Sequence, residues 1–212
     1  MDLYPKEDLV SIRPFLIIGG YGSTLITCVF TIVLVSIAPG PENDNGMLRY
    51  ISEGMESHCG WSTTVLGTCT FTILIVHVVA AVHMSNGHAI FWGLLQSLGW
   101  NIVLGVVDTG WTLHYVGLAM FLVGNVAYHW IASRDLAYGG LRYQQINIVC
   151  ILFAVIFIFA ASSSILFNNN RELRAIAVSM EFALVTVITF QNTFLVNALD
   201  QFKNIHLIFD HR

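Results

Sequence analysis

The sequence predicts an all-α polytopic membrane protein, a six-transmembrane-helix bundle with both the N-terminus and the C-terminus in the cytoplasm. Of the 212 residues, 56% are hydrophobic and only 10% are charged, whereas a soluble domain carries roughly 25% charged residues. Six apolar runs reach the roughly 20 residues that a bilayer core of about 30 Å requires. Residues 1–212 are therefore expected to form a single transmembrane domain.

Polar connectors separate the six runs and set the limits of the expected helices. The runs are Phe15–Ala38, Trp61–Met84, His88–Val107, Trp111–Ala132, Ile146–Phe167 and Leu173–Asn197. The first five contain no Asp, Glu, Lys or Arg, and the sixth contains Arg174 at its edge and Glu181 inside. The segment Ala38–Gly60 is rich in proline, glycine and asparagine, which break helices, so it is expected to be a loop.

Basic residues set the expected orientation. Six helices place both termini and the second and fourth connectors on one side of the membrane. That side carries six basic residues, Lys6, Arg13, Arg134, Arg142, Lys203 and Arg212, and the other carries three, Arg49, Arg171 and Arg174. Cytoplasmic segments are enriched in Lys and Arg, so the first side is expected to be cytoplasmic.

Four side chains form a candidate polar cluster near the outer face: Glu53, Asp108, His114 and Glu181. Glu181 lies about 12 Å below the outer end of its helix at helical rise. A charge at that depth costs at least ~2.5 kcal/mol, so the carboxyl group is expected either to stay protonated or to find a partner, for which His114 is the first candidate. The cluster could bind a lipid headgroup or a cation, or hold a proton. The alternative is a structural network that pins helix ends, with Asp108 capping a turn.

A second polar layer lies nearer the cytoplasmic ends of the helices. Its members are His77, Gln96, Asn125 and Gln191, joined by the neighbouring Asn192. Hydrogen bonds between helices are worth ~0.6–2 kcal/mol in a membrane. The favoured interpretation of this layer is structural.

Cofactor and metal chemistry find little support in the sequence. His77, His83, His114 and His129 lie only on the second and fourth runs, and the fifth and sixth runs contain no histidine. Facing histidines on four central helices, as in six-helix haem proteins, are therefore not expected. His77 and His83 do not have the spacing of an intramembrane zinc pair. No catalytic set, haem or metal is predicted, and bound lipid is the expected non-protein component.

Three short segments carry a resemblance to a known family. They are Tyr50–Gly54, the pair formed by Asp108 and His114–Gly117, and Glu181-Phe182 followed by Thr189-Phe190. In order and spacing they are similar to the motifs of the six-helix family that groups the damage-regulated autophagy modulators (DRAM) with the Sfk-type and GPI-lipid-remodelling proteins. Phe182 stands where that family more commonly has Trp, and Met55–His58 stands where it usually has prolines. The resemblance implies an endomembrane or plasma-membrane location and a scaffold or lipid-handling role.

The leading hypothesis is a non-catalytic integral membrane scaffold of the DRAM/Sfk-like type that binds lipids or partner proteins. One alternative is an accessory subunit of a larger membrane complex. Another is a lipid-remodelling enzyme that uses the outer His/acid cluster. Membrane lipids and other membrane subunits are the expected partners, whereas the net charge of −4 gives no reason to expect nucleic acid.

The C-terminal segment shows apolar residues at roughly helical spacing: Leu195, Leu199, Phe202, Ile205 and Phe209. This pattern predicts that the sixth helix continues beyond Asn197 as an amphipathic segment at the interface. A disordered tail is the alternative.

Overall fold

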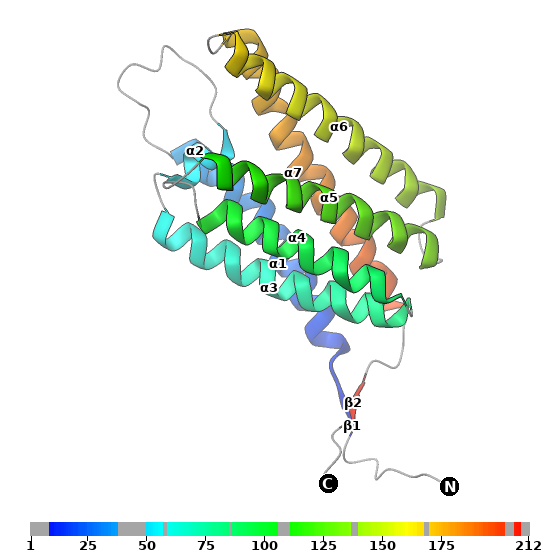
Figure 1. The fold of residues 1–212 in the computed structure, drawn as a ribbon. Coiled ribbons are helices and arrows are strands. Elements are labelled where there is room, and N and C mark those ends of the chain that lie inside the picture. Colours follow the sequence, from blue (N-terminus) through cyan, green and yellow to red (C-terminus); the bar gives the residue numbers. More distant parts are fainter. Residues whose placement is uncertain are drawn as a thin grey trace, which may run out of the picture.

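The computed structural model describes residues 9–37, 50–56, 59–84, 86–105, 111–136, 140–167, 170–201 and 206–208. Most of these residues are helical, and the long helices lie side by side with roughly aligned axes (Figure 1). In chain order the elements are β1 Leu9–Ser11, α1 Arg13–Ile37, α2 Ile51–Glu56, α3 Cys59–His83, α4 Gly87–Gly105, α5 Trp111–Asp135, α6 Gly140–Leu166, α7 Arg171–Asp200 and β2 His206–Ile208.

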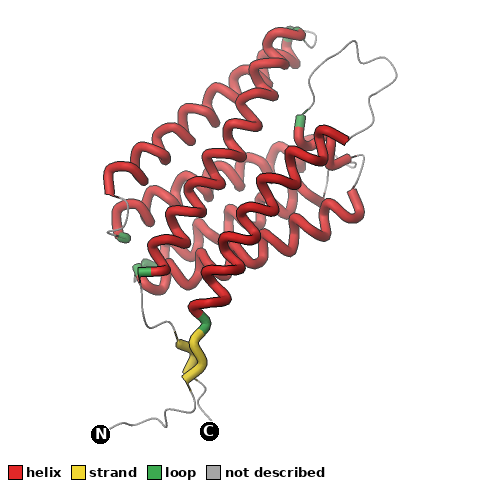
Figure 2. The backbone as a smooth tube through the Cα atoms, turned by 180° about the vertical axis from the view of Figure 1, so that it is seen from behind, coloured by secondary structure: helices red, strands yellow, loops and turns green. Residues whose placement is uncertain are grey.

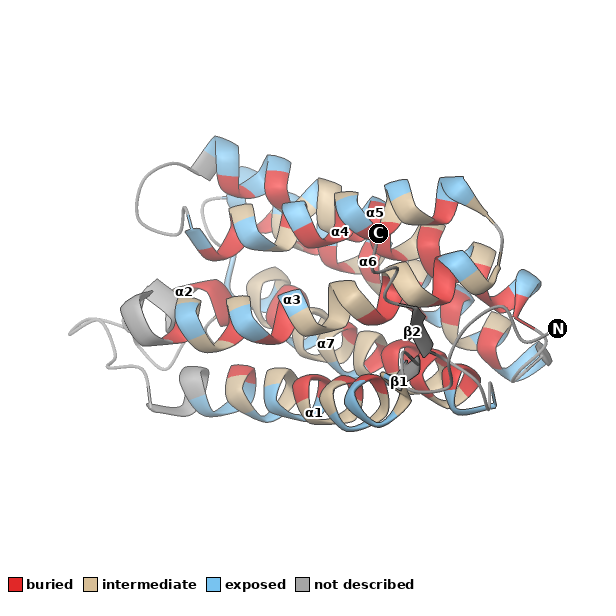
Figure 3. Ribbon diagram, turned by 90° about the horizontal axis from the view of Figure 1, so that it is seen from below, coloured by how far each residue is buried: buried red, intermediate tan, exposed pale blue. Residues whose placement is uncertain are grey.

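Five of the helices, α1, α3, α5, α6 and α7, are long and apolar enough to cross a membrane. Large apolar side chains cover their outer surfaces; Ile18 is 73% exposed and Phe159 is 72% exposed. Figure 3 shows exposed residues along the outer sides of the helices and buried ones between them. Water would not tolerate so much apolar surface, but lipid does. The chain is an all-α, multi-pass membrane protein.

The first connector contains helical residues that the sequence did not predict. Within the expected loop Ala38–Gly60, Ile51–Glu56 form the short helix α2, and α3 already begins at Cys59. The N–H of Tyr50 donates to Glu53 Oε2 at 2.9 Å, so the glutamate satisfies a main-chain donor that the first helical turn leaves free.

Two further helix ends differ from expectation. Helix α6 begins at Gly140 rather than Ile146, because the polar residues before Ile146 include Tyr143, which is fully buried against the bundle. Helix α7 ends at Asp200, and His206–Ile208 form a strand. The expectation of an amphipathic helix through Phe209 was therefore wrong, and Phe209 itself lies outside the described residues.

The two ends of the described chain are tied together. Strands β1 and β2 pair in antiparallel register, with Leu9 opposite Ile208. Just above them, Arg13 Nη2 on α1 lies 2.5 Å from Asp200 Oδ1 on α7. Figure 2 shows the two strands together at one end of the bundle.

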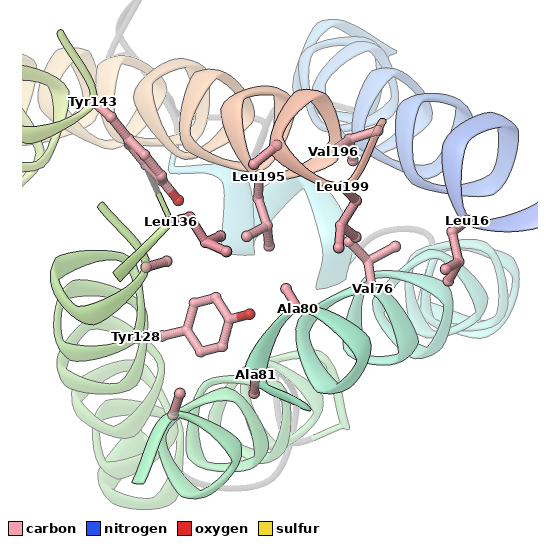
Figure 4. Packing of buried hydrophobic residues seen from close by; sticks show 13 residues of the cluster. Leu16, Val76, Ala80, Ala81, Tyr128, Leu136, Tyr143, Leu195, Val196 and Leu199 are labelled. Carbon is pink, nitrogen blue, oxygen red and sulfur yellow. The ribbon is translucent and has the colours of Figure 1, made fainter. Parts of the chain in front are cut away.

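A main apolar cluster lies near the strand end of the bundle and joins all six long helices, α1, α3, α4, α5, α6 and α7. In Figure 4 the ring of Tyr128 reaches from α5 toward Ala80 and Ala81 of α3, with Leu195 and Leu199 of α7 nearby. Its hydroxyl donates to the His77 carbonyl at 2.7 Å.

Helices α4 and α5 approach very closely. A Cβ added at Gly99 would stand 2.3 Å from the backbone nitrogen of Phe121, and one at Gly124 would stand 2.5 Å from that of Gln96. Only glycine leaves room for this backbone contact, as is typical of helix pairs packed in a membrane.

Candidate functional site

A cavity of about 510 Å³ lies between α5, α6 and α7, with α4 and α2 completing its wall. This volume falls in the range of ordinary small-molecule sites, roughly 300–1,000 Å³. Its lining residues are Tyr50, Ile51, Ser52, Glu53, Trp100, Val103, His114, Tyr115, Leu118, Phe121, Leu122, Phe157, Ala161, Ser164, Ile165, Arg174, Glu181, Leu184, Val185 and Ile188.

Most of this lining is apolar. Phe121 and Leu122 come from α5, Phe157 from α6, and Leu184 and Ile188 from α7. These side chains belong to one apolar cluster that joins the three helices. The interior of the cavity therefore suits a hydrocarbon chain rather than a polar metabolite.

Charged groups gather at the α2 end of the cavity. Arg174 Nη2 donates to both carboxylate oxygens of Glu53, at 2.5 and 2.8 Å. The Arg174 guanidinium also lies 4.9 Å from the centre of the Tyr50 ring, a cation–π geometry. Burial, opposed by the charge of Arg174, raises the pKa of Tyr50, so its hydroxyl stays neutral. These contacts hold α2 against the start of α7.

Glu181 lies deeper on α7, seven residues beyond Arg174 and therefore on the same face of the helix. Its Oε2 accepts the N–H of Ile51 at 2.8 Å. We expected a side-chain partner, first of all His114, but the partner is a main-chain donor at the start of α2. A hydrogen bond of His114 goes to the backbone of Val103 on α4.

Three of the four residues of the expected outer cluster, Glu53, His114 and Glu181, line this one cavity although they come from α2, α5 and α7. Asp108, the fourth, lies outside the described residues. Sequence reasoning placed Arg174 at a helix edge and gave it no role beside Glu53. The available signal was its spacing of two helical turns from Glu181.

The inner polar layer forms one buried chain of amides. Gln96 on α4 donates to Asn125 on α5 at 3.0 Å, Asn125 donates to Gln191 on α7 at 2.8 Å, and Gln191 donates to Asn147 on α6 at 2.7 Å. All four side chains are at most 4% exposed. Sequence reasoning missed Asn147, which closes the chain, because it stands at the first turn of the expected helix.

Histidines and tyrosines extend this layer toward the strand end. His129 Nδ1 lies 2.6 Å from the Tyr143 hydroxyl, and Asn147 donates to the His129 carbonyl at 2.8 Å. His77 Nε2 lies 3.3 Å from Asn192 Oδ1. Among the described residues, three buried atoms of the layer have no hydrogen-bond partner: His77 Nδ1, Gln96 Oε1 and His129 Nε2.

Neither polar region resembles a metal centre. Within the part of the chain that the structure describes, no three His, Cys, Asp or Glu side chains converge as metal ligands would. Comparison with family models, with curated proteins and with solved structures gave no match.

Proposed function

We propose that the chain is a non-catalytic lipid-binding membrane protein that holds the hydrocarbon part of a lipid in the cavity between α5, α6 and α7. The observation that carries the proposal is the division of a single cavity into an apolar interior and a charged end. An amphipathic lipid has the same division, with its acyl chain beside Phe157 and Leu184 and its headgroup beside Glu53, Arg174 and Glu181.

We further propose that α4 also crosses the membrane, which gives six spans. Five crossings would put the two termini on opposite sides, whereas β1 and β2 pair at one end of the bundle. Helix α4 has 19 residues and packs against both α3 and α5. It is the shortest of the long helices, and it carries the polar side chains His88, Gln96 and Asn101.

The basic residues support a cytoplasmic strand end. Arg13 begins α1, Arg134 lies in the last turn of α5, and Arg142 lies in the first turn of α6. In an alternating six-helix bundle all three share the end that carries β1 and β2. The charged end of the cavity would then lie at the outer face.

The resemblance to the DRAM/Sfk-like family gains support from the cavity. Each segment that carries the resemblance contributes lining residues, namely Tyr50–Glu53, His114 with Tyr115, and Glu181. If the members of that family share a pocket, the segments that carry the resemblance are expected to meet at it. A binding role also fits the hydrogen bonds of His114 and Glu181 to main-chain groups better than the enzyme hypothesis does.

The experiment is native mass spectrometry of the purified protein after mild delipidation. The wild type should retain one lipid, and Ala161→Trp, which fills the cavity from α6, should retain at least tenfold less. Ser162→Trp is the matched control, because Ser162 is exposed on the same helix and outside the cavity. Equal lipid retention by the two variants would contradict the proposal. A companion protein at fixed stoichiometry, with no lipid, would favour the accessory-subunit alternative.

A further inference from the structure

We infer that the lipid held in this cavity carries a primary ammonium group, as in phosphatidylethanolamine; this rests on the proposed function. The inference comes from the charge balance at the α2 end of the cavity. Two carboxylates, Glu53 and Glu181, and one guanidinium, Arg174, line the cavity.

The guanidinium is committed to Glu53. Arg174 donates to both oxygens of that carboxylate, and the side chains of Arg174 and Glu53 are only 18% and 26% exposed. Paired bonds of this kind are short and strong because both groups are charged. Arg174 and Glu53 therefore balance each other, and the remaining carboxylate decides the net charge of this end.

Glu181 has no cationic partner among the described residues. Its hydrogen bond comes from the neutral N–H of Ile51 and uses only Oε2. An ionised carboxylate inside a membrane protein is expensive, so the group takes up a proton unless a positive charge compensates it. A ligand can supply that charge.

A primary ammonium group fits this position. It carries a positive charge and three N–H donors, whereas a carboxylate offers only acceptors. The three phospholipid headgroups share an anionic phosphate and differ beyond it: a quaternary choline group has the positive charge but no N–H, and a glycerol group has no positive charge. Tyr115, which is 45% exposed and lines the same cavity, adds an aromatic face within the lining.

The test is lipid binding to the full-length protein in detergent, measured by native mass spectrometry with four dioleoyl lipids. These are phosphatidylethanolamine, phosphatidylcholine, phosphatidylglycerol and uncharged diacylglycerol, so only the headgroup varies. Phosphatidylethanolamine should bind at least about fivefold more tightly than phosphatidylglycerol, with phosphatidylcholine between them. Glu181→Gln should reduce this ratio to near one, and Glu172→Gln, an exposed change at the start of the same helix, should preserve it.

If Glu181→Gln fails to fold, the binding of the four lipids to the wild-type protein still tests the ammonium inference. Equal binding of the four lipids, or tighter binding of phosphatidylglycerol, would overturn the ammonium inference and leave the lipid-binding proposal standing. Absence of binding by all four lipids would overturn both. An unchanged headgroup ratio in folded Glu181→Gln would overturn the role assigned to that carboxylate.

Discussion

The amide layer and the outer cavity are both polar regions inside a membrane protein, yet they use polarity in different ways. In the amide layer, Asn125 accepts from Gln96 and donates to Gln191, so neutral groups on three helices satisfy one another. In the cavity, Glu181 places a carboxyl group at the edge of an open space of about 510 Å³. Neutral groups that pair with one another stabilise a bundle, whereas a carboxyl group that lines a cavity without a cationic partner among the described residues offers a ligand a place to bind.

Asn125→Leu should have the largest effect on stability, because it removes the central member of the amide layer. The substitution leaves Gln96 Nε2 and Gln191 Oε1 buried without partners, at a cost of about 2–4 kcal/mol. Unfolding in mixed micelles would measure this loss. Asn101→Leu is the control, since Asn101 is exposed and donates to the Ser97 carbonyl of its own helix. Similar losses from both substitutions would refute the structural role of the layer.

Tyr143→Phe should cost less, about 1 kcal/mol, because it removes the single close contact between the Tyr143 hydroxyl and His129 Nδ1 while keeping the ring. The ring continues to stack on Phe194, with 5.5 Å between centroids. The melting temperature should fall while lipid binding is unchanged. Tyr143→Leu, which also removes the ring that stacks on Phe194, is the comparison that should lower the melting temperature further. A loss of lipid binding in Tyr143→Phe would show that the two regions are coupled.

The ion pair at the cavity should contribute least to stability. A double-mutant cycle with Glu53→Gln and Arg174→Gln should give a coupling energy of about 1 kcal/mol, since the pair is only partly buried. Amide hydrogen exchange of Ile51–Glu56 should accelerate in either single variant, because α2 loses its ion pair with α7 and keeps the hydrogen bond from Ile51 to Glu181. Unchanged exchange there would mean that the loop holds α2 without the pair.

The sequence predicted the long helices well because lipid imposes a simple rule. Every backbone group within the hydrocarbon must be satisfied inside its own segment, so a long apolar run becomes a helix. The polar segments at the ends of the helices are not subject to this rule. Gly140–Gln145 were left out of a helix although Tyr143 is buried there, and the helix α2 lay hidden in a segment dominated by turn residues.

The cavity was less predictable than the helices. Composition and depth indicated that Glu181 required a partner, and a hydrogen-bond partner exists. Its identity, the N–H of Ile51, depends on how the chain between α1 and α3 returns to the bundle, which no local pattern encodes. The pairing of β1 with β2 has the same origin, because residues nearly 200 positions apart meet only after the helices have packed.

Photocrosslinking with a diazirine-labelled phosphatidylethanolamine, mapped by peptide mass spectrometry, tests the cavity most directly. Labelling of Leu184 and Ile188, which line the cavity, should saturate at a low ratio of probe to bulk lipid and should be lost in Ala161→Trp. Labelling of Phe159, which is 72% exposed on the outer face of α6, should rise in proportion to the probe. If Leu184 and Ile188 remain unlabelled, or if their labelling rises in proportion like that of Phe159, the cavity does not hold phosphatidylethanolamine.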